Sequence, residues 1–176
     1  MVTKPAYYDL FEGQRVELIG GQVFGKPRPS PRHAWTVSLL HPKLREFFGD
    51  GYVVCVNAPM NLGEDSEPEP DLMIVKGSVR SLTSHPTSAE LVIEYSDSTL
   101  ALDSGMKASL YARHGVREYW IVNLRDQCLE VRRRIVADGS EPFGFRYEDV
   151  QFFEAGDAVA PVAAPRSKIA VADLLP

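Results

Sequence analysis

Apolar residues in this chain gather into short runs whose length suits β-strands. Residues 71–75 and 91–95 are runs of this kind, each with one carboxylate, and residues 118–122 are predicted as a further strand. Apolar runs that are not broken by alternating polar residues are typical of central strands covered on both faces. The pattern therefore predicts a sheet whose middle strands are buried.

Two other segments carry apolar residues at the spacing of a helix. Residues 33–48 show the 3.6-residue period. Pro42 is expected to kink that helix or to split it after Leu40, because proline lacks the N–H that an interior position donates. A second helix is predicted over residues 103–114, with Gly115 as its C-cap, since glycine adopts the left-handed conformation without steric cost.

Turn residues predict two hairpins that flank the apolar runs in sequence. Residues 15–24 form two short strands around Gly20 and Gly21, which tolerate the positive φ of a tight turn. Residues 128–136 and 143–153 form another hairpin around Asp138 and Gly139. The remaining segments are expected to be a strand-pair region (52–62), loops (25–32 and 63–70) and a strand or helical turn (169–175). This order of elements predicts an α/β fold with a mixed sheet and helices on its faces.

Length and composition indicate an ordinary folded protein. The chain has 176 residues, 44% of them hydrophobic and 24% charged, so a single domain over residues 1–176 is predicted. No apolar run approaches the ~20 residues that span a bilayer, and the N-terminus lacks the apolar segment of a signal peptide. Cys55 and Cys128 are expected to be reduced, buried thiols. We therefore expect a cytoplasmic protein that does not enter a membrane.

The net charge of -5 bears on possible partners. It argues weakly against a protein that coats nucleic acid through bulk electrostatics. It does not exclude a nuclease, because a metal site needs clustered carboxylates and a local basic strip can still contact phosphates.

Two carboxylates within the apolar runs are candidates for chemistry. Asp71 opens one run, and Glu94 stands near the end of another. Charged groups are rarely buried without partners, and two acids on neighbouring strands could share a hard cation such as Mg²⁺. The alternative for either acid alone is an edge carboxylate that caps a turn or pairs with an arginine.

Lys107 is the candidate cation beside these acids. It lies four residues after Asp103 and four before Tyr111, so the three share one helix face and the lysine could reach the site. The alternative is a surface pair between Asp103 and Lys107, worth about 0.2–0.5 kcal/mol. Spacing alone leaves both open.

The sequence shows no pattern typical of other kinds of active or metal site. His33, His41, His85 and His114 lack the spacing of metal ligands, and no cysteine pair supports zinc. No nucleophile elbow and no phosphate-binding glycine loop is present.

Six short stretches occur in an order that is more specific than any one of them. They are VELIGGQ (16–22), SPRH (30–33), EPDL (69–72), LVIEYS (91–96), DSGMK (103–107) and YARHGVREYWIV (111–122). With this set the chain resembles the Uma2 family of bacterial endonucleases, in the PD-(D/E)xK superfamily, over a core of about residues 15–135. The resemblance implies a restriction-endonuclease-like fold, a mixed sheet flanked by helices with additional hairpins.

The resemblance also implies roles for individual residues. Asp71 and Glu94 would be catalytic residues that bind Mg²⁺ or Mn²⁺, and Lys107 would be the catalytic lysine. In the superfamily that lysine usually stands two residues after the glutamate, where this chain has Ser96. Lys107 on the next helix would therefore replace it.

The implied activity is metal-dependent endonucleolytic hydrolysis of DNA, with a homodimer as a further expectation. His33 and Arg32 would bind substrate, although a packing or capping role is an equal alternative for His33. Glu17 or the residue at position 22 could supply a further acid near the site. The alternative for the whole protein is a catalytically impaired nuclease-fold module that binds or regulates. It is favoured by the acidic net charge and by Gln22, where the family usually has an acid.

Overall fold

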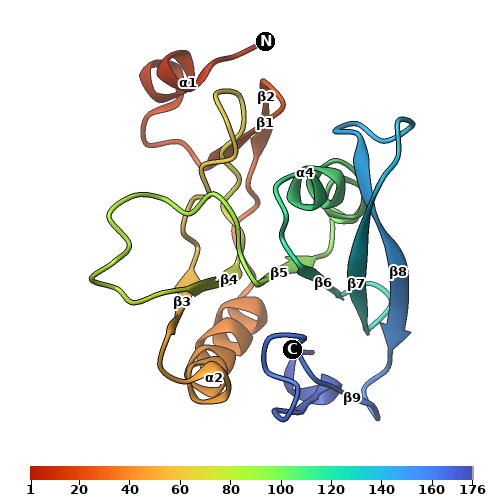
Figure 1. The fold of residues 1–176 in the computed structure, drawn as a ribbon. Helices are drawn as coiled ribbons and strands as arrows, with labels where there is room; N and C mark the ends of the chain where they lie inside the picture. The colour runs from red at the N-terminus through yellow and green to blue at the C-terminus, as the bar shows by residue number, and fades with distance from the viewer. Residues whose placement is uncertain (176) are drawn as a thin grey trace.

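The three apolar runs form the middle of the main sheet in the computed structural model, which describes residues 1–175 (Figure 1). They are β4 (Leu72–Lys76), β5 (Leu91–Ser96) and β6 (Glu118–Asn123). Every residue of β5 and β6 is buried, as expected for strands covered on both faces. The predicted burial is confirmed for β4 and β5, and β6 is a third buried strand.

Antiparallel strands extend the sheet on both sides to the order β3-β4-β5-β6-β7-β8. They are β3 (Tyr52–Val56) at one edge and the hairpin of β7 (Cys128–Ala137) and β8 (Phe145–Phe153) at the other. Only the β5–β6 pair is parallel among the described strands, so the sheet is mixed, as predicted. The strand-pair region expected over 52–62 is wrong beyond Val56, because residues 57–62 run as a loop.

One face of the sheet is covered by α2 (Pro31–Phe48) together with the C-terminal segment (Figure 1). That segment contains β9 (Ala158–Val159), β10 (Ile169–Ala170) and the 3₁₀-helix η2 (Val171–Asp173), so the tail forms both a strand and a helical turn.

The predicted split of α2 at Pro42 is wrong, since the helix runs through it. Leu40 and Leu44 on either side are both buried in the core. Burying a leucine gains about 1.5–3 kcal/mol, so the pair together offsets the ~3 kcal/mol that an interior proline costs.

The opposite face is covered by the helical crossover that joins β5 to β6. It consists of α3 (Leu100–Leu102), a π-helical turn η1 (Asp103–Lys107) and α4 (Ala108–Arg113). The crossover begins three residues before the predicted start and ends as expected at Gly115, which has a φ of 71°. Single π-helical turns often lie at functional sites.

The N-terminal part packs beside the edge of the sheet. It contains α1 (Lys4–Phe11), which the apolar pattern did not predict, and the predicted hairpin of β1 (Val16–Ile19) and β2 (Gln22–Gly25). A single antiparallel bridge from Leu18 to Glu67 ties the hairpin to the loop before β4. This bridge is what brings β1 to the end of β4, where Asp71 stands. No helix among the described residues is long and apolar enough to cross a membrane.

Candidate active site

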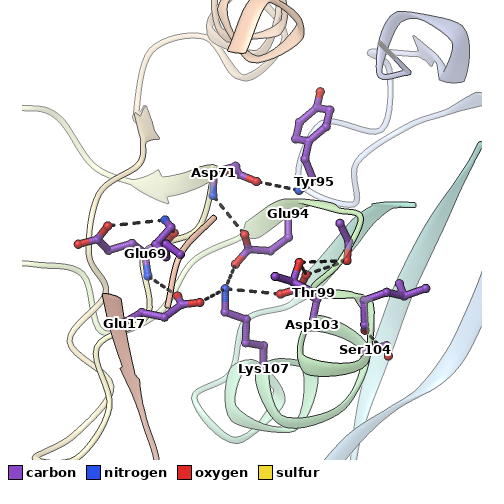
Figure 2. Close-up of polar contacts among 12 residues, drawn as sticks. Glu17, Glu69, Asp71, Glu94, Tyr95, Thr99, Asp103, Ser104 and Lys107 are labelled. Atoms are coloured by element: carbon purple, nitrogen blue, oxygen red, sulfur yellow. Dashed lines mark hydrogen bonds and ion pairs between the residues drawn. The ribbon is translucent and has the colours of Figure 1, made fainter. Parts of the chain in front are cut away.

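Four elements that are distant in sequence bring their charged side chains to one place (Figure 2). Glu17 comes from β1, Asp71 from the residue before β4, Glu94 from β5 and Lys107 from η1. β4 and β5 are antiparallel, and Leu72 pairs with Ile93, which places Asp71 beside Glu94. The predicted convergence of Asp71, Glu94 and Lys107 is therefore present.

Lys107 is the centre of the cluster. Its side chain is only 3% exposed, and its Nζ lies 2.8 Å from Oε1 of Glu17, 2.9 Å from Oε1 of Glu94 and 3.5 Å from Oδ1 of Asp103. Burial alone would lower the pKa of Lys107, but the surrounding carboxylates outweigh it and hold the pKa well above its usual value. The alternative of a solvent-exposed Asp103–Lys107 pair is thus wrong.

Glu94 shares one of its oxygens between two donors. Its Oε1 accepts hydrogen bonds from Nζ of Lys107 and from the hydroxyl of Tyr111, both at 2.9 Å. Burial raises the pKa of Glu94 to about 8; Lys107 opposes this rise and the neighbouring carboxylates add to it. Its other oxygen accepts only a long 3.4 Å bond from the backbone N–H of Asp71, and is therefore the less engaged of the two.

Asp71 is tuned in the opposite direction. Its Oδ2 accepts a 2.8 Å hydrogen bond from the backbone N–H of Tyr95, and its Oδ1 lies 3.4 Å from Nε2 of His33. Burial alone would raise the pKa of Asp71, but the hydrogen bonds and charge around it outweigh burial and lower the pKa. Asp71 is thus ionised at neutral pH, whereas Glu94 takes up a proton much more readily.

His33 faces Asp71 from the first turn of α2. Its ring stacks on that of Tyr95, with centroids 4.8 Å apart and an interplanar angle of 22°. Ser30 caps this helix by accepting a hydrogen bond from the His33 backbone N–H, which fixes where the helix begins. The fixed helix start and the stacked ring together orient the imidazole toward Asp71.

Asp103 and Glu17 belong to the cluster, although the apolar pattern did not single them out. Oδ2 of Asp103 accepts hydrogen bonds from the hydroxyls of Ser96 (2.8 Å) and Thr99 (2.6 Å). Burial raises the pKa of Asp103, against the lowering effects of Lys107 and these hydroxyls. Glu17 is held by a 3.2 Å bond from the Glu69 backbone N–H. Only the resemblance pointed to an acid from the hairpin, because the sequence of β1 does not show which strand it approaches.

These residues line a pocket of about 180 Å³. Its walls are the cluster just described, the loop over residues 26–30 and the turn after β5. Lys26 and Arg28 of the loop bring positive charge to the lining of this pocket. A phosphate group could thus meet both basic side chains and acidic oxygens there.

The carboxylates fit a hydrated divalent cation. Mg²⁺ prefers oxygen ligands, often keeps several waters and is commonly held by one or two carboxylates. Asp71 and Glu94 supply such a pair at the pocket, and the buried acids outnumber the buried ammonium of Lys107. Within residues 1–175, no group of three or more His, Cys, Asp and Glu side chains is arranged to hold an ion. The donor set therefore suits an ion completed by water and phosphate oxygens, not a full protein cage.

Two residues singled out from the sequence lie away from the cluster. Arg32 is exposed on the first turn of α2, on the outside of the helix. Gln22 is exposed at the turn end of β2. Because Gln22 lies outside the cluster, having no acid at position 22 leaves the charge around Lys107 unchanged. The acid that the hairpin brings to the site is Glu17.

Comparison with known proteins relates this chain to one family and to solved structures of the same fold. A family profile, Uma2, described as "Putative restriction endonuclease", matches residues 5–172. A crystal structure of "a putative nuclease belonging to DUF820" from Anabaena variabilis has a TM-score of 0.77 at 17% sequence identity, covering 99% of this chain and 97% of that one. At this identity the likeness shows a shared fold. A search of curated proteins found no match.

Proposed function

We propose that this chain, which belongs to the Uma2 family, is an endonuclease that uses Mg²⁺ or Mn²⁺ to hydrolyse DNA phosphodiester bonds. The observation that carries the proposal is the buried cluster itself. One lysine is enclosed by acids from three different elements at the floor of a pocket with basic residues on its rim. A protein would not bury this many charges for stability alone, because desolvation of each costs several kcal/mol.

In this proposal Asp71 and Glu94 hold the ion. A bound divalent ion would polarise a phosphate oxygen and lower the pKa of a bound water. His33 fixes the rotamer of Asp71 through its Nε2, and Tyr111 fixes that of Glu94. Both acids are therefore held in place before any ligand arrives, which spares reorganisation during the reaction.

Lys107 would serve as the catalytic lysine. Its three donors point at three carboxylates, and the contact to Asp103, at 3.5 Å, is the longest. That is the donor most readily turned toward an attacking water or a charged phosphate oxygen. The shorter contacts to Glu17 and Glu94 keep the ammonium in position while that donor is in use, and Asp103 itself is held by Ser96 and Thr99.

A catalytically silent binding module is the second candidate. It is favoured by the same ammonium, because Lys107 already neutralises part of the charge that a metal ion would otherwise neutralise. The two candidates differ in whether the carboxylate pair binds a divalent ion and whether DNA is cut.

The test is cleavage of supercoiled plasmid with Mn²⁺ or Mg²⁺, set beside EDTA, together with the thermal shift that each ion produces. Glu94→Gln should abolish both the shift and the cleavage, since it removes the charge that holds the ion. Asp71→Asn should do the same. Lys107→Ala should lose cleavage but still show the shift at a pH high enough to ionise Glu94, because lysine is not a ligand of the ion. Gln22→Glu is the control, because it adds a carboxylate outside the cluster and should change neither. A metal shift without cleavage of plasmid, linear or single-stranded DNA would favour the silent module.

A further inference from the structure

The segment that carries His33 is unusually basic for this chain. Residues 18–45 contain none of the 24 acidic residues and five of the 19 basic ones. Three of these five, Lys26, Arg28 and Arg32, lie in the loop at the pocket or on the first turn of α2. A protein with a net charge of -5 thus presents a local strip of positive charge beside its candidate active site.

The outer face of the same helix exposes two large apolar side chains. Trp35 is 72% exposed and Leu39 is 68% exposed, one helical turn apart. With Pro31, Arg32 and Thr36 they line a shallow hollow of about 250 Å³. The other tryptophan, Trp120, is fully buried. Tryptophan is highly buried on average, so a solvent-exposed indole beside a basic strip indicates a contact surface.

The hollow and the candidate active site are lined by neighbouring residues at the start of α2. His33 lies on the inner side of the first turn and lines the pocket, while Arg32 and Trp35 lie on its outer side. A helix with its side chains is about 10–12 Å across. A strand seated in the pocket could therefore reach the indole by passing over one helix turn.

Resting on the nuclease proposed above, we infer that Trp35, Leu39 and Arg32 hold an unpaired stretch of the DNA substrate, with a base stacked on the indole. Arg28 and Arg32 contact the flanking phosphates. An aromatic platform beside a basic track is how proteins hold single strands, since every base presents a flat face for stacking. Bases inside a duplex are already stacked and would leave the indole unused. The preferred substrate is therefore DNA with a single-stranded segment next to the scissile bond.

The charge pattern argues against a second copy of this chain on the same face. Two copies would bring Arg28 and Arg32 against their own equivalents, and like charges at close range are unfavourable. The next acidic residue along α2 is Glu46, two turns beyond Leu39, so the exposed turns offer no complementary charge. A polyanion meets this surface without that conflict.

The test uses the indole as its own probe. A twelve-base oligo-dT is titrated into the protein in EDTA while tryptophan emission is followed; Trp120 is buried, so quenching reports Trp35. Stacking of one base predicts that Trp35→Ala weakens binding about tenfold or more, while Trp35→Phe, which keeps a flat ring, stays near wild type. Phe152→Ala, which removes an exposed aromatic side chain on β8, is the matched control and should bind as wild type.

An abasic strand of equal length separates stacking from charge. It should bind wild type and Trp35→Ala equally and weakly. Equal binding of oligo-dT by wild type and Trp35→Ala would overturn the inference, and so would tight binding of the abasic strand by wild type. Loss of a dimer in Trp35→Ala, seen by sedimentation together with unchanged strand binding, would assign the surface to self-association and overturn it as well.

The two proposals fail separately because binding in EDTA needs no cleavage. Trp35-dependent strand binding by a protein that cuts no DNA would overturn the nuclease and leave the contact surface. Normal cleavage in Trp35→Ala, with no preference between a duplex and a duplex with a single-stranded flap, would overturn the contact surface and leave the nuclease.

Discussion

Replacing Lys107 by methionine tests how the buried cluster is balanced. Methionine keeps most of the side-chain volume and removes the ammonium, so Glu17 and Glu94 lose the cation 2.8 and 2.9 Å from their oxygens. Removing one partner of a buried ion pair costs about 3–5 kcal/mol, because it leaves an uncompensated charge. All three side chains are nearly inaccessible to water, so solvent offers little screening.

The loss should depend on pH. Without the ammonium, the pKa of Glu94, already about 8 in the wild type, rises further above its unfolded value of about 4.3. The folded state of the variant then binds more protons than the unfolded state between those values. The wild type behaves in the same way up to its own Glu94 pKa of about 8, so the cost of the substitution grows as pH rises past that value and shrinks below it. We expect a loss of about 3–5 kcal/mol at pH 9, where the wild-type Glu94 is ionised and paired, and a clearly smaller one at pH 6, where it is protonated in both proteins.

The assay is urea unfolding of both proteins at pH 6, 7, 8 and 9. Lys43→Met is the matched control, because Lys43 pairs with Asp173 at the same 2.8 Å distance but both side chains are nearly half exposed. That change should cost less than ~1 kcal/mol at every pH. A loss for Lys107→Met that is the same at all four pH values, or no larger than the control, would refute the reasoning.

Three further outcomes follow from the site and its surroundings. Glu118→Gln should cost about 3–5 kcal/mol in urea unfolding, because the buried carboxylate pairs with Arg133, whereas Glu148→Gln, in an exposed pair, should cost under ~1 kcal/mol; equal losses would contradict this. Tyr111→Phe removes a hydrogen bond to Glu94 and should lower the free energy of unfolding by about 1.5–3 kcal/mol; an unchanged urea midpoint would show that this bond does not stabilise the fold. The Mn²⁺-induced thermal shift should grow from pH 6 to pH 8.5, because Glu94, with a pKa of about 8, must release its proton to bind the ion; a shift independent of pH would exclude it as a ligand.

The sequence by itself determined the strands that carry the candidate site. Uninterrupted apolar runs are typical of strands covered on both faces, so β4 and β5 could be placed in the middle of a sheet from the apolar pattern alone. A carboxylate inside such a run has to be buried with the strand or to displace it. This conflict singled out Glu94 as a candidate site residue. Helical spacing likewise placed Lys107 and Tyr111 on one face, because that relation depends only on residues four apart.

Only the tertiary structure decided which charges meet. Glu17 reaches Lys107 because one bridge ties β1 to the loop before β4, and no local pattern encodes a bridge between residues 49 positions apart. The pairing of His33 with Asp71 likewise depends on where α2 crosses the sheet. Local signals also left a split at Pro42 open, and there burial of the flanking leucines outweighed the break. Propensity and spacing act within a few residues, whereas the pKa values of this cluster arise from strand register and helix placement over the whole chain.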